Sequence, residues 1–86
     1  MQKIEIIEKL SGFITGELLQ NPEYALKEDE ALFSNGTIDS FAIAQIGVFV
    51  ETEFDLYIPD SDLTVENMDT VSQMADRVMA GLSDQD

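Results

Sequence analysis

Apolar side chains recur at helical spacing in the first part of the chain. Residues 3–19 predict an amphipathic helix, because side chains at steps of three and four lie on one helical face. The row comprises Ile4, Ile7, Leu10, Ile14 and Leu18, widened by Ile6 and Phe13. Gly12 and Gly16 share a face of this helix, where each costs about 1 kcal/mol relative to alanine. We expect a neighbouring helix to approach closely there; a break near residue 12 is the alternative.

The next stretch, residues 20–39, is long for a connection, and long connections often carry function. Three apolar side chains can anchor it to the core: Leu26, Leu32 and Phe33. Asn35-Gly36 predicts a tight turn within it. A second helix follows over residues 40–54, again from steps of three and four. Its apolar row is Ile43, Ile46, Val50 and Phe54, with Val48 and Phe49 beside it.

The last third of the chain predicts a loop, a short helical turn and a final helix. Residues 55–63 form the loop, with Leu56 and Ile58 turned inward, and residues 64–68 form the turn. Thr70 and Gln73 fit a capping box, so the final helix begins at residue 71. Gly81 favours a stop, so we expect the helix to end near Ala80 and residues 82–86 to fray.

These elements predict an all-α fold: a four-helix bundle of three longer helices and one short helix, with a long first connection. The chain has 86 residues, enough for a single domain over 1–86 with a thin core. We place the ordered part at about residues 3–81.

Composition excludes several classes of function. The 4 basic and 18 acidic residues give a net charge of −14, which repels nucleic acids and anionic membranes. The absence of histidine and cysteine excludes a histidine-assisted triad, a thiolate nucleophile, a Cys/His zinc site and disulfides. No apolar stretch reaches the roughly 18 residues of a membrane span, and the start lacks the apolar core of a signal peptide. We expect a cytoplasmic monomer without stable membrane insertion.

The strongest local signal is the segment Gly36–Phe41, at the entrance to the second helix. A helix N-terminus presents unpaired N–H groups and partial positive charge, so it stabilises a phosphate. A serine in the first turn after a glycine turn is open to modification, which places Ser40 well to carry a phosphodiester. The plainer interpretation is that Ser40 or Asp39 only caps the helix, a role that both residue types favour.

This segment resembles the attachment site of acyl and peptidyl carrier proteins, where the serine of an Asp-Ser-(Leu/Met/Phe) motif carries 4′-phosphopantetheine. Residues 39–41 read Asp-Ser-Phe here. Residues 50–60 resemble the family's acidic helix end and apolar-X-apolar-Pro loop, and residues 69–71 resemble the start of its last helix. The resemblance covers about residues 3–80, which is nearly the whole chain.

The resemblance implies the family's four-helix fold and its mechanism. A phosphopantetheinyl transferase would attach the arm of coenzyme A to Ser40, with Asp39 and Phe41 as the flanking motif. The arm's thiol would hold an acyl or aminoacyl group as a thioester. The chain would carry it from a loading enzyme, adenylating or acyl-transferring, to a downstream synthase. Ser40 is then a substrate of the transferase, and the chain is a non-catalytic carrier.

Family members dock on basic patches of their partners through the second helix and nearby loops. The corresponding acidic candidates are Asp39, Glu51, Glu53, Asp55, Asp60 and Asp62. Exposed charges of this kind raise association rates and add little affinity, which suits brief docking. The plainer interpretation is a solvated acidic face that maintains solubility.

The sequence departs from the members that serve fatty-acid synthesis, which commonly carry Leu after the serine and an acidic residue five positions past it. Phe41 and Gln45 stand there instead. The approach Gly-X-Ile-Asp-Ser-Phe is more similar to free-standing specialised carriers, such as the D-alanyl carriers of teichoic-acid modification. We therefore expect a dedicated carrier in a specialised pathway. Gly47 leaves room for cargo along the second helix, although we favour ordinary tight packing.

Other interpretations stay open to different degrees. The main alternative is an acidic interaction module without a prosthetic group that binds a basic groove; Ser40→Ala would then be silent. Asp60-X-Asp62-X-Thr64 begins like a calcium loop, but Val65 and Val71 replace its glycine and glutamate, so we predict no metal site. An enzyme is the weakest alternative, because so short a chain has little material for a cleft.

Overall fold

The computed structural model of the chain describes residues 1–84. Within them every regular element is helical, which confirms the predicted all-α fold with three longer helices and one short helix. The elements are α1 (Lys3–Phe13), the π-helical turn η1 (Ile14–Leu18), α2 (Ala42–Phe54), the 3₁₀ turn η2 (Asp60–Asp62), α3 (Val65–Met68) and α4 (Val71–Asp84).

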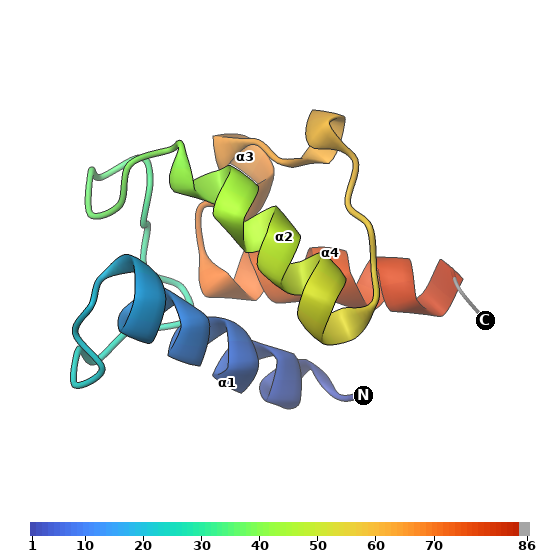
Figure 1. Ribbon diagram of the computed structural model, residues 1–86, viewed down its shortest axis with the longest axis horizontal. Helices are drawn as coiled ribbons and strands as arrows, with labels where there is room; N and C mark the ends of the chain where they lie inside the picture. Colours follow the sequence, from blue (N-terminus) through green and yellow to red (C-terminus); the bar gives the residue numbers. More distant parts are fainter. Residues whose placement is uncertain (85–86) are drawn as a thin grey trace.

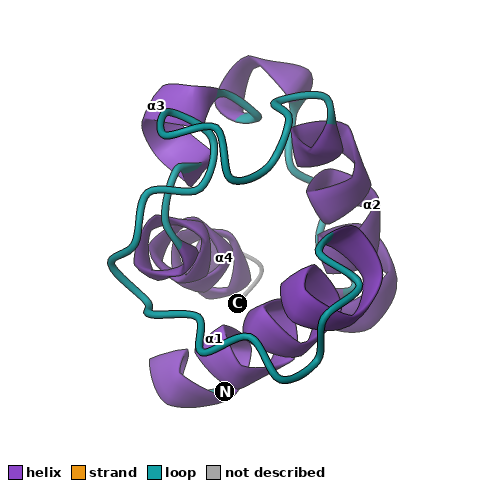
Figure 2. Cartoon of the chain, turned by 90° about the vertical axis from the view of Figure 1, so that its left-hand side faces the viewer, coloured by secondary structure: helices purple, strands orange, loops and turns teal. Residues whose placement is uncertain are grey.

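The helices surround one apolar core. α1 runs opposite to α2 and α4, and the short α3 lies at the end where the long connection enters α2 (Figure 1). A view from that end shows α1, α2, α3 and α4 arranged around a common centre (Figure 2). Every helix contributes side chains that are fully buried, as does the long connection: Ile6, Leu10, Ile14, Leu32, Ile46, Val50, Met68, Val71, Met74 and Val78. The molecule is therefore held together by burial on one face of each helix.

The buried row of α1 differs from the predicted one. Ile6, Leu10 and Ile14 are fully buried, whereas Ile4 is 54% exposed and Ile7 is half-buried. The predicted row contained two overlapping sets of positions at helical spacing, one through Ile4 and Ile7 and one through Ile6. The core lies on the side of the helix that Ile6 shares with Leu10. Sequence spacing alone could not choose between the two sets because both satisfy steps of three and four.

The expectation for Gly12 and Gly16 is wrong. Both are exposed, and no atom of a neighbouring element lies within 4 Å of where a Cβ would stand. The alternative expectation, a break near residue 12, is closer to the structure, because the α-helix changes to the π-helical turn after Phe13. Thr15 donates its hydroxyl to the Ser11 carbonyl (2.9 Å), and the Leu19 N–H reaches back to the Ile14 carbonyl (2.8 Å).

The apolar row of α2 is confirmed. Ile43, Ile46, Val50 and Phe54 are all buried, and Phe49 is half-buried against α1. The rings of Phe49 and Phe13 stack with their centroids 4.4 Å apart. Val48 departs from the prediction and is 64% exposed. Leu56 and Ile58 turn inward as expected, and the Thr64 side chain caps the predicted short helix α3.

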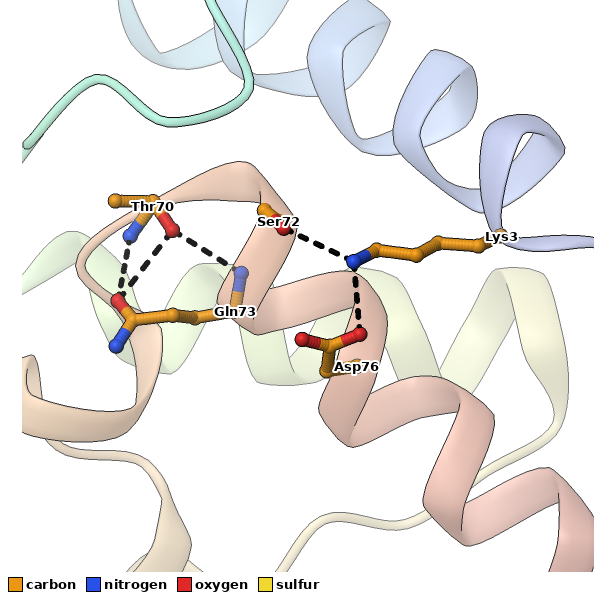
Figure 3. Close-up of polar contacts among 5 residues, drawn as sticks. All are labelled: Lys3, Thr70, Ser72, Gln73 and Asp76. Atoms are coloured by element: carbon orange, nitrogen blue, oxygen red, sulfur yellow. Dashed lines mark hydrogen bonds and ion pairs between the residues drawn. The ribbon is translucent and has the colours of Figure 1, made fainter.

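The start of α4 confirms the predicted capping box (Figure 3). The Gln73 N–H donates to the Thr70 hydroxyl (3.1 Å), and the Thr70 N–H donates to the Gln73 side-chain oxygen (3.1 Å). Lys3 of α1 binds the same helix by donating to the Ser72 hydroxyl (3.0 Å) and pairing with Asp76 (2.9 Å). The first turn of α4 is thus satisfied within itself and tied to α1.

The end of α4 does not follow the prediction. The helix continues through Gly81 to Asp84, so residues 82–84 are helical rather than frayed, and residues 85–86 lie outside the described residues. Gly81 serves packing here. A Cβ at this position would stand 2.7 Å from both Leu56 methyl carbons, so the glycine lets the loop after α2 lie directly on α4. From the sequence alone, a glycine that allows close packing cannot be distinguished from a glycine that ends a helix.

Candidate functional site

Ser40 lies exposed just before the first turn of α2. No residue of the described chain hydrogen-bonds its hydroxyl. The Asp39 carboxylate accepts the Phe41 N–H (3.0 Å), directly before α2. Phe41 stands at the N-cap position of α2, and no side chain caps this helix. The plainer interpretation, in which Ser40 or Asp39 caps the helix, is therefore wrong, and the Ser40 hydroxyl is left unused.

The first two N–H groups of α2 are bonded by the segment itself. The Asp39 carbonyl accepts the Ala42 N–H (2.9 Å), and the Ser40 carbonyl accepts the Ile43 N–H (3.1 Å). The sequence suggested unpaired N–H groups at this point. A phosphate on Ser40 would instead be stabilised by the partial positive charge of the helix start and by water.

The turn before Ser40 has the predicted tight geometry. Gly36 adopts a positive φ of 82°, and its N–H donates to the Phe33 carbonyl (3.2 Å). The Asn35 side chain accepts the Thr37 N–H (3.0 Å). Ile38 is only 7% exposed, so the chain is pinned to the core two residues before Ser40. Ser40 therefore projects from a fixed point rather than from a loose loop.

Two shallow hollows follow α2 away from Ser40. The first, of about 340 Å³, is lined by Ser40, Phe41, Ile43, Ala44, Asp60 and Leu63. The second, of about 190 Å³, shares Ala44, Asp60 and Leu63 with it and extends to Val48, Glu51 and Tyr57. Together they form a mostly apolar groove that begins at the serine. Phe41, Val48 and Tyr57 stand exposed along it, at 85%, 64% and 64%.

The groove does not open into the core. A Cβ on Gly47 would stand 2.9 Å from a Leu63 methyl carbon, so Leu63 fills the space that the glycine leaves. Behind it, Ile46, Val50 and Val71 are fully buried. The structure therefore has the expected tight packing in this region rather than a cavity for cargo.

The six acidic candidates for partner binding have different surroundings. Asp39 accepts the Phe41 N–H, Glu53 pairs with Lys9 (2.9 Å), and Asp62 pairs with Arg77 (3.1 Å). The hydrogen bond to Glu53 and the attraction of its carboxylate raise the pKa of Lys9. Asp55 ends α2 with a positive φ of 54°. Glu51 and Asp60 line the groove, which makes them the acidic candidates closest to Ser40 along it.

Three of the four basic side chains form ion pairs within the described chain. Lys3, Lys9 and Arg77 each pair with a carboxylate of another element. These pairs join α1 to α4, α1 to α2, and α4 to η2. The charge that the surface presents to a partner is therefore dominated by carboxylates.

Asp69 was not singled out by the sequence as a site residue. Its carboxylate lies between α3 and α4 and accepts hydrogen bonds from the segment Leu32–Ser34 in the long connection. Desolvation raises its pKa, but the hydrogen bonds from the Ser34 hydroxyl and three backbone N–H groups outweigh this, so its pKa lies below the ordinary value. The only sequence signal was an aspartate next to the capping-box threonine, a position that exposed aspartates often occupy.

Comparison with protein-family profiles and with curated proteins finds no match for this chain. Within the described residues, no group of acidic side chains is arranged to hold a metal ion. No helix among them is long and apolar enough to cross a membrane.

The residues around Ser40 fit a phosphopantetheine group in two respects. The serine hydroxyl is exposed and not engaged by the chain, and an apolar groove begins beside it.

Proposed function

We propose that this chain is an acyl or aminoacyl carrier protein whose Ser40 bears 4′-phosphopantetheine. The observation that carries the proposal is the division of roles between two neighbouring residues. The Asp39 carboxylate binds the Phe41 N–H ahead of α2, whereas the Ser40 hydroxyl is exposed beside the start of the helix and at the mouth of an apolar groove. A serine kept only to cap the helix would have its hydroxyl bonded to the first turn.

Ser40 acts as the acceptor in the loading step. Its Oγ forms a bond to phosphorus while the bond from that phosphorus to adenosine 3′,5′-bisphosphate breaks, and the hydroxyl proton passes to the transferase. Phe41, which is 85% exposed, offers that enzyme an apolar contact directly beside the reacting oxygen. The attached group supplies a thiol that holds the cargo as a thioester.

The acidic surface supports brief docking to partner enzymes. Glu51 and Asp60 border the groove, so a loading enzyme and a downstream synthase with basic patches would approach the same face that carries Ser40. The uncharged middle of α2 and Phe41 after the serine favour a specialised cytoplasmic pathway over general fatty-acid synthesis. The closed interior behind Leu63 favours a cargo that stays outside the bundle.

The test is intact mass after incubation with coenzyme A and a broad-specificity phosphopantetheinyl transferase. We expect one added phosphopantetheine on the wild type and on Ser61→Ala, which removes another exposed serine, and none on Ser40→Ala. A folded wild type that gains no mass, also with the transferase of its own host, would contradict the proposal. The acidic interaction module would then be the better account, since the net charge is −14 and three of the four basic side chains are paired within the chain.

A further inference from the structure

Asp69 makes the densest set of hydrogen bonds that any side chain makes in the described part of the chain. Its Oδ1 accepts the backbone N–H groups of Leu32 (3.2 Å), Phe33 (2.8 Å) and Ser34 (3.0 Å). Its Oδ2 accepts the Ser34 hydroxyl (2.6 Å). The Asp69 backbone carbonyl also accepts the Leu32 N–H (2.8 Å). One residue thus satisfies three consecutive donors that lie 35 to 37 positions earlier in the chain.

These bonds hold the turn from which Ser40 projects. The Leu32 carbonyl accepts the Ile38 N–H (2.9 Å), so both ends of the turn meet beside Asp69. Leu32 is fully buried and Ile38 nearly so, which fixes this junction to the core. Ser40 follows Ile38 by two residues. Its position relative to α2 and the groove therefore depends on the junction at Leu32.

Asp69 itself stands on a rigid support. It lies between α3, capped by Thr64, and the capping box that opens α4, which Figure 3 shows together with Lys3. The Ser72 N–H adds a second link to the long connection by donating to the Glu28 carbonyl (2.9 Å). The long connection is thus held from the α4 side rather than from α2, the helix that it leads into.

We propose that Asp69 is a positioning residue for the modification of Ser40. The proposal rests on the carrier function proposed above. Asp69 keeps the turn over residues 32–38 in the one conformation that presents the serine to the transferase. Without it, that conformation would be only partly populated, and the apparent affinity of the transferase would fall by the same fraction. The chemical step, once the complex is formed, would be little changed.

The test is the steady-state kinetics of loading with coenzyme A and a broad-specificity phosphopantetheinyl transferase, with the carrier as the varied substrate. We expect Asp69→Ala to raise KM about tenfold and to leave kcat within about twofold. Asp69→Asn retains an acceptor oxygen and should give a smaller rise. Asp76→Asn removes a charge from the same helix region and should match the wild type. Gly81→Ala, which disturbs packing against Leu56 far from the turn, controls for lost stability.

A second readout does not depend on loading. Amide hydrogen exchange at residues 32–42 should accelerate in Asp69→Ala and Asp69→Asn, while the amides of α1 keep their protection. An unchanged KM in folded Asp69 variants, an equal rise of KM in Gly81→Ala, or unaltered exchange at Phe41 and Ala42 would each overturn the positioning role. A wild type that is never loaded would instead remove the carrier function, and this proposal with it.

Discussion

The starts of α2 and α4 each lie near a hydroxyl-bearing residue, and these two hydroxyls have different uses. At the start of α4, the Thr70 hydroxyl accepts the Gln73 N–H (3.1 Å) and is part of the cap (Figure 3). Ahead of α2, the Asp39 carboxylate accepts the Phe41 N–H, and the Ser40 hydroxyl stays exposed. An aspartate precedes the hydroxyl in both places, but the Asp39 carboxylate binds the Phe41 N–H two residues ahead, whereas the Asp69 carboxylate binds the distant segment Leu32–Ser34. A hydroxyl at a helix start is thus a structural group in one place and a candidate attachment point in the other.

Removal of the Ser40 hydroxyl should have the largest effect on function and almost none on stability. Ser40→Ala should abolish the addition of phosphopantetheine, because no other hydroxyl has this setting. The free energy of unfolding should stay within about 0.5 kcal/mol of the wild type, since the side chain is exposed and makes no bond within the described chain. Urea denaturation and intact mass measure the two quantities. A clear loss of stability would mean that Ser40 also caps α2 in solution.

Removal of the Thr70 hydroxyl should show the opposite pattern. Thr70→Ala should lower the free energy of unfolding by about 1 kcal/mol, because the Gln73 N–H loses its acceptor. Loading at Ser40 should continue at a rate set by the folded fraction. Thr70→Ser is the matched control and should restore most of the stability. Equal stability of Thr70→Ala and Ser40→Ala would contradict the difference in use between the two hydroxyls.

The sequence predicted most of this arrangement, for reasons that differ from element to element. The buried row of α2 and the capping box of α4 follow from local spacing, which a sequence displays directly. The hydrogen bond of Asp39, rather than Ser40, to the backbone ahead of α2 does not, because both residue types can accept an N–H at a helix start.

Other features were out of reach because they depend on contacts between distant residues. The link from Asp69 to Leu32 joins positions 37 apart. The role of Gly81 becomes visible only when Leu56 is placed against it. The π-helical turn begins after Phe13, between apolar residues that are four positions apart in the sequence, Ile14 and Leu18. This spacing is the same as in an α-helix, so the apolar pattern gave no sign of the turn.

Asp69 precedes the start of α4 and binds the turn that leads to α2. Its contribution to stability should depend on pH. Its pKa lies below the ordinary value of 3.8 in the folded state, so the ionised form is favoured by folding. The stabilisation is therefore complete above pH 3.8 and is lost as the pH falls through the folded-state pKa. Asp69→Asn should be less stable than the wild type at neutral pH by less than about 1 kcal/mol, because the amide oxygen still accepts N–H groups.

The pH dependence is measured as the difference in urea midpoint between the wild type and Asp69→Asn across the acid range. The difference should shrink below pH 3.8 as Asp69 becomes protonated. Taking the difference cancels the common effect of the other carboxylates. A difference that grows in acid would contradict the assignment of a lowered pKa to Asp69.

The smallest effect should come from the ion pair that accompanies the cap of α4. Lys3 and Asp76 lie 2.9 Å apart, but their side chains are 40% and 66% exposed, so water and salt screen their attraction. Asp76→Asn should change the free energy of unfolding by only a few tenths of a kcal/mol, and this change should fade at high salt. Lys3 keeps its bond to Ser72 (3.0 Å) in this variant. A cost equal to that of Thr70→Ala would mean that docking to α1, rather than the capping box, fixes the start of α4.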